Sequence, residues 1–246
     1  MTRVAAVTGG AGGIGEAVVL RLAEDGCLPV VLDTNEAAAR WLIAELKERD
    51  IAAACLMVDV TQAVAVREAF GKIVSDFGRI DVLVNVAGGT LHKHAVEDFP
   101  LAHWQATIDA NLTSAFLCSQ AVIGAMKSQQ GGSIINISSA IGFAGAVNRA
   151  TYATAKSGIV GFSKALALEL APYGIRVNVV APGRTATKRV VAGYSPEEWQ
   201  SADKLNPLGR AAEPGEIADA VAFLAAEASG YMTGQTLHVN GGKFMP

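Results

Sequence analysis

The sequence lacks an excess of charge of either sign. Lys and Arg number 20 and Asp and Glu number 23, so the formal net charge is −3. Proteins that bind nucleic acid or an anionic membrane surface usually concentrate basic residues for that purpose. The composition therefore predicts no nucleic-acid partner and no membrane partner.

Cysteine is scarce, and long hydrophobic runs are missing. Cys27, Cys55 and Cys118 are odd in number, far apart and in apolar surroundings, which favours free thiols of a reducing compartment over a disulfide framework. The N-terminal segment reaches Gly9 before an apolar region of signal-peptide length can form. The longest uncharged run, residues 128–148, is too rich in Gly, Ser, Gln and Asn for a bilayer helix. We expect a cytoplasmic protein.

Short apolar runs alternate with longer helical patterns along most of the chain. Hydrophobic residues make up 51% and charged residues 17%, which excludes disorder and predicts a large core. The runs are continuously apolar, as in strands covered on both faces of a parallel sheet. The expected strands are 3–8, 28–33, 53–59, 80–85, 133–138, 175–181 and 236–239. The expected helices are 14–25, 36–49, 64–77, 101–127, 152–170 and 214–226.

This alternation predicts an α/β fold, a doubly wound parallel sheet of about seven strands with helices on both faces. No repeat, linker or low-complexity tract interrupts it, so we expect a single domain over residues 1–246. Residues 183–210 have no clear strand and contain Pro196 and Pro207. An irregular segment of this length usually forms a lid or a binding loop, and we expect a substrate loop here.

A glycine-rich turn joins the first expected strand to the first expected helix. Glycines there allow a tight turn and a close approach of the backbone to a pyrophosphate, which the helix N-terminus would bind. The alternative is a strand-to-helix turn that binds nothing. The candidate cofactor-binding residues of the turn are Gly9, Gly12, Gly13, Ile14 and Gly15.

Asp33 ends the second expected strand, eighteen residues after Gly15. A carboxylate near this spacing binds both ribose hydroxyls of a dinucleotide and repels a 2′-phosphate. The next residue is Thr34 rather than a basic residue, and the glycine turn has no basic residue. The pattern favours NAD(H) over NADP(H). The alternative is that Asp33 is an N-cap or turn acid before Asn35 and Glu36.

Tyr152 and Lys156 are four residues apart at the start of an expected helix. Such a pair lies on one helix face, and a nearby ammonium favours the phenolate, which lowers a phenol pKa that is ordinarily about 10. Ser139 comes thirteen residues before Tyr152, at the end of the apolar run 133–139. In a parallel α/β sheet, this is the edge where ligands bind.

Taken together, these motifs resemble the short-chain dehydrogenase/reductase family, of the single-domain type, over essentially the full length. Each piece is weak alone, but their order and spacing are specific. The resemblance implies a Rossmann-type fold. The matching residues are Thr8-Gly9-x-x-x-Gly13-x-Gly15, Asp33, Asp59-Val60, Asn85-Val-Ala-Gly88, Asn111, Ser139, Tyr152-x-x-x-Lys156 and Pro182-Gly183 with Thr187.

The resemblance also implies a role for each matching residue. The general acid/base would be Tyr152, with Ser139 bound to the reacting oxygen; Lys156 would hold the nicotinamide ribose and Asn111 would position a proton-relaying water. The residues expected beside the adenine and its ribose are Asp59, Val60, Asn85, Ala87 and Gly88. Those expected to cover the nicotinamide end are Pro182, Gly183, Thr185 and Thr187.

Two positions depart from the family pattern. Val86 stands where members often have Asn, which removes one polar contact under the fourth strand. Arg184 follows Pro182-Gly183, where members often have a bulky apolar residue. The second departure leaves cofactor binding intact and indicates an unusual substrate side.

Several polar residues on the expected pocket loops are candidates for substrate contact. His92 and His94 form a His-x-His pair, but no third ligand is evident nearby, so we expect no metal and interpret the pair as a polar loop rim or a substrate contact. Arg149, Arg184, Lys188 and Arg189 are either solvated surface residues or partners of an anionic substrate. Tyr194 belongs to the expected substrate loop.

The sequence therefore predicts an NAD-dependent oxidoreductase that interconverts a small-molecule secondary alcohol, or a β-hydroxyacyl group, and its ketone. The first alternative is a 3-oxoacyl-carrier-protein reductase, a branch that generally uses NADPH and that the C-terminal residues 231–242 resemble. An enoyl reductase is disfavoured because that branch separates Tyr and Lys more widely. A non-catalytic dinucleotide sensor is the alternative from another class. The resemblance also implies a homotetramer, or a homodimer.

Overall fold

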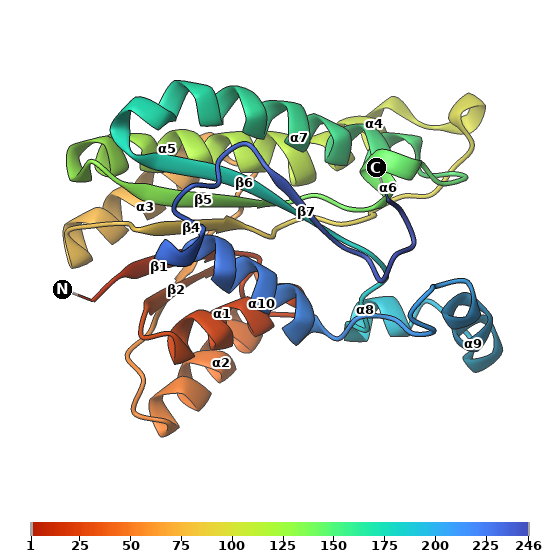
Figure 1. The fold of residues 1–246 in the computed structure, drawn as a ribbon, viewed down its shortest axis with the longest axis horizontal. Coiled ribbons are helices and arrows are strands. Elements are labelled where there is room, and N and C mark those ends of the chain that lie inside the picture. The colour runs from red at the N-terminus through yellow and green to blue at the C-terminus, as the bar shows by residue number, and fades with distance from the viewer. Residues whose placement is uncertain (1, 246) are drawn as a thin grey trace.

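The computed structural model describes residues 2–245 and contains one sheet of seven parallel strands. The strand order is β3-β2-β1-β4-β5-β6-β7, and Figure 1 shows the strands running side by side through the molecule. The predicted α/β fold with a doubly wound parallel sheet is confirmed. The strands are β1 (Val4–Thr8), β2 (Leu28–Asp33), β3 (Ala54–Met57), β4 (Val82–Asn85), β5 (Gly132–Ile137), β6 (Ile175–Pro182) and β7 (Thr236–Val239).

Helices cover both faces of the sheet. Helices α1, α2 and α10 lie on one face, and α3, α5 and α7 lie on the other (Figure 1). The α-helices are α1 (Ile14–Glu24), α2 (Glu36–Glu48), α3 (Ala63–Phe77), α4 (Leu101–Ile108), α5 (Ser114–Gln129), α6 (Ile141–Ala144), α7 (Ala150–Leu170), α8 (Lys188–Val191), α9 (Pro196–Lys204) and α10 (Pro214–Ala225). Short 3₁₀ turns are η1 (Val96–Asp98), η3 (Ala171–Tyr173) and η4 (Glu227–Ser229).

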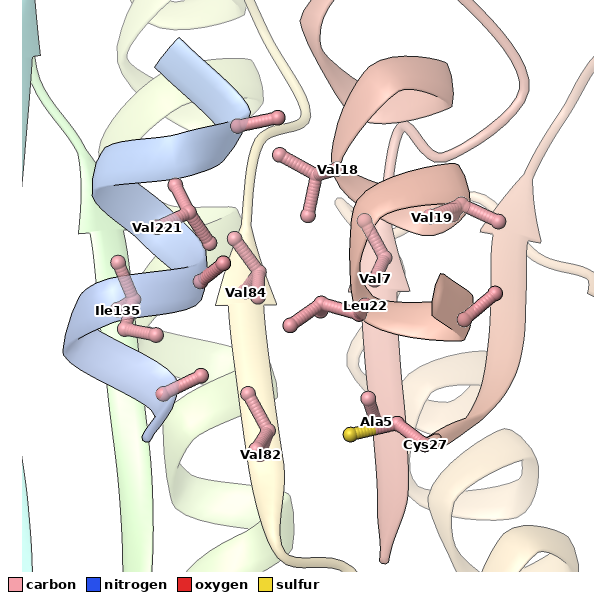
Figure 2. Close-up of a cluster of buried hydrophobic side chains, with 14 of the residues drawn as sticks. Ala5, Val7, Val18, Val19, Leu22, Cys27, Val82, Val84, Ile135 and Val221 are labelled. Carbon is pink, nitrogen blue, oxygen red and sulfur yellow. The ribbon is translucent and has the colours of Figure 1, made fainter. Parts of the chain in front are cut away.

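Two hydrophobic cores explain why the strands are continuously apolar. Alternate side chains of a strand point to opposite faces, so Ala5 and Val7 join one core while Val4 and Ala6 join the other. Figure 2 shows the first core, in which side chains of α1 and α10 pack over those of β1, β4 and β5. Burial on both faces leaves no place in these strands for the polar alternation of a half-exposed sheet.

The direction of winding reverses between β1 and β4. The chain passes from β1 outward to β2 and β3, then returns to pair β4 with the other side of β1. In open α/β sheets, ligands bind at the carboxyl ends of the strands beside such a reversal. The fold therefore predicts a ligand site at the loops after β1 and β4.

The helical stretch expected over 101–127 is interrupted. Residues Asp109–Thr113 form a π-helical turn, η2, between α4 and α5. The side-chain amide of Asn111 donates to the carbonyl oxygens of Thr107 (2.9 Å) and Gly89 (3.0 Å). This amide competes for helix hydrogen bonds and anchors a distant loop, and periodicity alone cannot indicate such a contact. Single π turns are frequent at functional sites.

The segment expected to be irregular, residues 183–210, contains the two short helices α8 and α9. Ser195 and Glu198 form a capping box that starts α9, which stabilises the helix N-terminus. Both helices project beyond the sheet at the right of Figure 1. Within residues 2–245, no helix combines the length and the apolar character that crossing a membrane would require.

Candidate active site

The turn after β1 is held in place by close backbone contacts. A Cβ atom on Gly15 would lie 1.9 Å from the carbonyl oxygen of Gly9, and one on Gly10 would lie 2.9 Å from that of Val7. Gly9 has a φ of +62°, and a Cβ there would meet Ala87 at 3.0 Å. Gly12 has nothing within 4 Å of a Cβ. The turn is therefore rigid at its ends and open at Gly12, as a backbone cradle for a phosphate needs to be.

Asp33 fastens this turn to the end of β2. Its Oδ2 accepts a hydrogen bond from the backbone N–H of Ala11 (3.0 Å), and its Oδ1 accepts from those of Thr34 (2.8 Å) and Asn35 (2.9 Å). The side chain that caps α2 is that of Asn35 rather than Asp33. No Lys or Arg side chain of residues 2–245 forms an ion pair or a hydrogen bond with Asp33.

The loop after β4 lies against the glycine turn. The hydroxyl oxygen of Thr8 accepts hydrogen bonds from the N–H groups of Val86 (3.1 Å) and Ala87 (3.2 Å). Asn85 is 5% exposed, and its amide donates to Asn136 (2.8 Å) inside the layer between the sheet and the helices. A contact between Asn85 and an adenosine group would therefore use the backbone.

Asn111 fixes the next part of this loop from the π turn. Its Oδ1 accepts from the N–H of Gly89 (2.8 Å), and its Nδ2 donates to Gly89 O as described above. A Cβ on Gly88 would lie 2.4 Å from the same Oδ1. The structure thus uses the Asn111 side chain to shape the loop beside the predicted nicotinamide end.

Ser139, Tyr152 and Lys156 meet at the carboxyl edge of the sheet. Ser139 follows β5, and Tyr152 and Lys156 lie in the first two turns of α7, where the side chains of Ser139 and Tyr152 are hydrogen-bonded. Lys156 is 3% exposed, and its Nζ donates to the carbonyl oxygen of Ile137 (2.8 Å) and lies 5.8 Å from the centre of the Tyr152 ring. The three residues expected to carry proton transfer are thus brought together.

Charges around this group differ from the sequence expectation. Burial raises the pKa of Tyr152, while the Ser139 hydrogen bond and the positive charges of Arg189 and Arg149 lower it. Burial, together with a smaller repulsion from Arg189, lowers the pKa of Lys156 to about 7. Two arginines, Arg189 and Arg149, thus add positive charge that favours the phenolate of Tyr152.

The segment after β6 closes over the glycine turn. Gly183 lies against Asn240, since a Cβ there would be 2.8 Å from its Cα, and the hydroxyl of Thr185 donates to Gly183 O (3.3 Å). Thr187 caps α8, and its methyl group would lie 3.2 Å from a Cβ on Gly13. Residues that are far apart in the sequence thus form one continuous surface with the turn.

The remaining predicted contacts with adenine lie after β3. The carboxylate of Asp59 accepts hydrogen bonds from the N–H (2.9 Å) and the hydroxyl (2.7 Å) of Thr61. Val60 is 9% exposed and packs among the hydrophobic residues under β2. Both residues follow a strand that pairs with β2, so they lie at the same edge of the sheet as Asp33.

Arg184 is engaged inside its own segment. Its guanidinium forms an ion pair with Asp203, donates to the carbonyl oxygen of Trp199 (3.1 Å) and lies 4.3 Å from the Trp199 ring. The ring of Tyr194 lies 5.8 Å from the same guanidinium. These contacts hold α9 to the end of β6, so the structure gives Arg184 a partner other than a substrate anion.

Arg189 is the arginine of this segment that reaches the candidate site. Its guanidinium donates to the carbonyl oxygen of Gly88 (3.3 Å), and it forms no ion pair with a carboxylate of residues 2–245. Arg149 reaches the same loop from the start of α7, where it donates to the hydroxyl of Thr90 (3.4 Å). Sequence analysis placed Arg189 among four charged residues of the expected pocket loops but could not single it out as the one that contacts Gly88.

Two further side chains of the loop after β4, His92 and His94, lie together with His103 of α4. The rings of His92 and His103 are stacked, with their centres 3.7 Å apart. Sequence analysis found no third ligand near His92 and His94, and the fold brings His103 of α4 to them. The short spacing of nine residues between His94 and His103 is the feature of the sequence that could have indicated a third ligand.

Comparison with known proteins agrees with this arrangement. A family profile described as "Enoyl-(Acyl carrier protein) reductase" matches residues 9–243. An acetoacetyl-CoA reductase of Allochromatium vinosum is 43% identical over 249 residues, covering 100% of both chains. A 3-oxoacyl-[acyl-carrier-protein] reductase FabG of Vibrio cholerae is 38% identical over 243 residues, covering 99% of this chain and 98% of the relative.

The chain belongs to the short-chain dehydrogenase/reductase family. A solved structure described as "Crystal structure of gox2181" superposes with a TM-score of 0.94 at 36% sequence identity, covering 98% of this chain and 95% of the other. The protein is accordingly an oxidoreductase of this family. The predicted resemblance is confirmed over nearly the whole chain.

Proposed function

We propose that this short-chain dehydrogenase/reductase uses NAD(H) to interconvert a secondary alcohol, or a β-hydroxyacyl group, and the corresponding ketone. The observation that carries the proposal is the meeting of Ser139, Tyr152 and Lys156 beside a glycine turn that is fastened by Asp33. The named relatives act on 3-oxoacyl and acetoacetyl groups, which supports a 3-oxoacyl thioester as the first substrate class to test.

The chain offers a suitable site for the dinucleotide. The open backbone at Gly12 and the N-terminus of α1 would bind the pyrophosphate; Asp33 would bind the adenosine ribose, and Lys156 would bind the nicotinamide ribose. When bound, the nicotinamide supplies or accepts the hydride. The other residues proposed to border the cofactor are Gly9, Gly13, Ile14, Gly15, Asp59, Val60, Asn85, Ala87, Gly88, Pro182, Gly183, Thr185 and Thr187.

Tyr152 carries the proton in this proposal. Its phenol protonates the carbonyl oxygen during reduction, and its phenolate removes the hydroxyl proton during oxidation. Ser139 donates a hydrogen bond to the same oxygen and stabilises the charge that develops there. Lys156 orients the ribose and Asn111 holds the adjoining loop, so both act by positioning.

The choice of NAD(H) rests on Asp33. Its carboxylate forms no ion pair with a Lys or Arg of residues 2–245 that would offset its repulsion of a 2′-phosphate, and a carboxylate at this place binds ribose hydroxyls. A 3-oxoacyl-carrier-protein reductase that uses NADPH is the alternative, supported by the V. cholerae relative. Enoyl reduction is disfavoured by the four-residue spacing of Tyr152 and Lys156. A dinucleotide sensor would have no use for the Ser139–Tyr152 pair.

The arginines favour a substrate that carries a negative group. The positive charges of Arg149 and Arg189 act on Tyr152, and both side chains contact the loop after β4. A guanidinium without a carboxylate partner binds carboxylate or phosphate groups well. His92, His94 and Tyr194 remain candidates for contact with other parts of the substrate.

We also propose that the protein acts in the cytoplasm as a homotetramer or a homodimer. Helices α5 and α7 carry exposed apolar side chains, among them Phe116 (43% exposed) and Leu168 (81% exposed). Exposed apolar residues of this size on adjacent helices favour burial against another copy. Sedimentation analysis of the wild type and of Leu168→Glu would test this.

A substrate panel tests the proposed reaction. The purified enzyme receives NADH or NADPH together with acetoacetyl-CoA, a 3-oxoacyl-carrier protein, a simple ketone or an enoyl thioester. We expect NADH to be consumed with the 3-oxo compounds and not with the enoyl thioester, and the product to be a hydroxyl compound. Consumption with the enoyl thioester alone would assign the other reaction, and binding of NADH without turnover of any substrate would support the sensor.

A further inference from the structure

Three of the four histidines of the chain gather at one place outside the proton-transfer site. Each of His92, His94 and His103 offers a ring nitrogen, and these nitrogens all lie within 4.8 Å of one another. His92 and His94 extend from the loop after β4, whereas His103 lies in the first turn of α4. All three side chains are partly buried rather than fully exposed.

The chemistry of this cluster is incomplete without a ligand. Nδ1 of His103 is buried and has no hydrogen-bond partner in the described chain, and buried polar atoms are seldom left unpaired. The imidazoles of His92 and His94 form no hydrogen bond within residues 2–245 either.

Three imidazoles are a common donor set of transition-metal sites. Zn²⁺ binds imidazole nitrogen at about 2.0–2.1 Å, and a site with three protein ligands keeps a further position for water or another group. Two nitrogens on one tetrahedral ion are then about 3.3 Å apart. The nitrogens of the cluster would approach each other by up to about 1.5 Å, and the stacked rings of His92 and His103 would tilt apart.

The surroundings allow that adjustment. Lys93 and Leu91, which flank His92, are exposed, so the loop can move without disturbing a packed core. The cluster also lies close in sequence to Gly89 and Thr90, which Asn111 and Arg149 hold beside the candidate active site. An ion bound here would add one more attachment of the loop after β4, this time to α4.

We propose that His92, His94 and His103 form a binding site for a divalent transition metal, with Zn²⁺ as the first candidate, which fastens the loop after β4 to α4. The ion has a structural role in this proposal and takes no part in hydride or proton transfer. The proposal does not depend on the cofactor or the reaction proposed above, and it replaces the substrate contact considered there for His92 and His94. It revises the sequence expectation of no metal, because the fold supplies the third ligand.

Calorimetric titration of Zn²⁺ into untagged, chelator-treated protein tests the site. We expect one ion per chain in the wild type. Loss of an outer partner of a metal ligand already weakens binding by about 10–100-fold, so His103→Ala, which removes a ligand, should weaken it by about 100-fold or more. His238→Ala is the matched control, since it removes the one histidine outside the cluster and should leave the affinity unchanged.

A wild-type measurement keeps the test independent of how the variants fold. X-ray absorption of the zinc-loaded protein should give a first shell of nitrogen and oxygen donors that includes three imidazoles and no sulfur. Circular dichroism would confirm that His103→Ala is folded. Absence of stoichiometric Zn²⁺ binding by the wild type, equal affinity in folded His103→Ala, or a sulfur ligand from one of the cysteines would each overturn the proposal.

Discussion

Two loops at the same edge of the sheet are held in place in different ways. The turn after β1, residues 9–15, is set mainly by its own backbone, because Gly10 and Gly15 leave no room for a Cβ atom, and a single side chain, that of Asp33, fastens it at Ala11. The loop after β4 is instead held by side chains from distant elements: Asn111 from the π turn, Arg149 from the start of α7 and Arg189 from α8. The conformation of the first loop therefore follows from residues close together in the sequence, whereas that of the second depends on contacts with distant parts of the fold.

The largest expected effect concerns a residue that belongs to neither loop. Tyr152→Phe removes the proton-carrying hydroxyl, so kcat should fall by about 10²–10⁴-fold, while the Kd for NADH stays near that of the wild type because both loops are intact. Steady-state kinetics and NADH fluorescence titration measure the two quantities. Turnover like that of the wild type would refute the proposed acid/base role.

The next largest effect concerns Asp33, which fastens the turn after β1 and is expected to set the preference for NADH. Asp33→Ala with Thr34→Arg removes the repelling carboxylate and adds a partner for a 2′-phosphate. Each change should contribute about 1.4 kcal/mol or more, so the ratio of kcat/KM for NADPH to that for NADH should rise by about 100-fold. Asp33 also accepts from the backbone of Ala11, so Asp33→Asn with Thr34→Arg is the control that keeps an acceptor. An unchanged ratio in both variants would place cofactor choice elsewhere.

A moderate effect is expected from the two arginines that contact the loop after β4. Arg189→Ala should raise KM for acetoacetate far more than KM for its methyl ester, because a charge-assisted contact of about 1.5–3 kcal/mol corresponds to about 10- to 150-fold. Arg149→Ala is the parallel variant. Arg40→Ala is the control, since Arg40 is exposed and pairs with Glu36 on α2. If the acid and its ester are affected equally in both variants, the arginines do not select charge.

The smallest expected effect compares two glycines of the same turn. Gly15→Ala places a Cβ against the carbonyl of Gly9 and should weaken NADH binding by about tenfold. The overpacking should cost about 1–3 kcal/mol, which lowers Tm by roughly 2–12 °C in a chain of this size. Gly12→Ala, where a Cβ meets nothing, should leave Tm unchanged. Equal melting temperatures for both variants would contradict the steric account of the turn.

Features that neighbouring residues determine could be predicted from the sequence, whereas features that depend on contacts between distant elements could not. The strands Leu28–Asp33 and Thr236–Val239 match residue for residue, because apolar runs bounded by turn residues report burial directly. The break between α4 and α5 was missed, since it depends on a contact between Asn111 and a loop some twenty residues away. The third histidine and the position of Arg189 were missed for the same reason: both depend on which segments the fold brings together.

Arg184 was a candidate for binding a substrate anion, but in the structure it binds residues of its own segment. The sequence identified it as an unusual residue after Pro182-Gly183. In the structure, its guanidinium forms an ion pair with Asp203 and lies over the ring of Trp199. An arginine in a charged loop finds whichever carboxylate or aromatic ring the fold provides. Composition cannot tell such a residue from Arg189, which lacks an acidic partner in the described chain.

The most direct test of the central claim is the coenzyme preference of the unmodified enzyme. The measurement is kcat/KM for NADH and for NADPH, at saturating concentration of the best 3-oxo substrate from the panel. The Asp33 argument predicts that NADH is preferred by at least about tenfold, the ratio that corresponds to about 1.4 kcal/mol. Equal efficiencies, or a preference for NADPH, would contradict the account and favour the NADPH-dependent 3-oxoacyl-carrier-protein reductase.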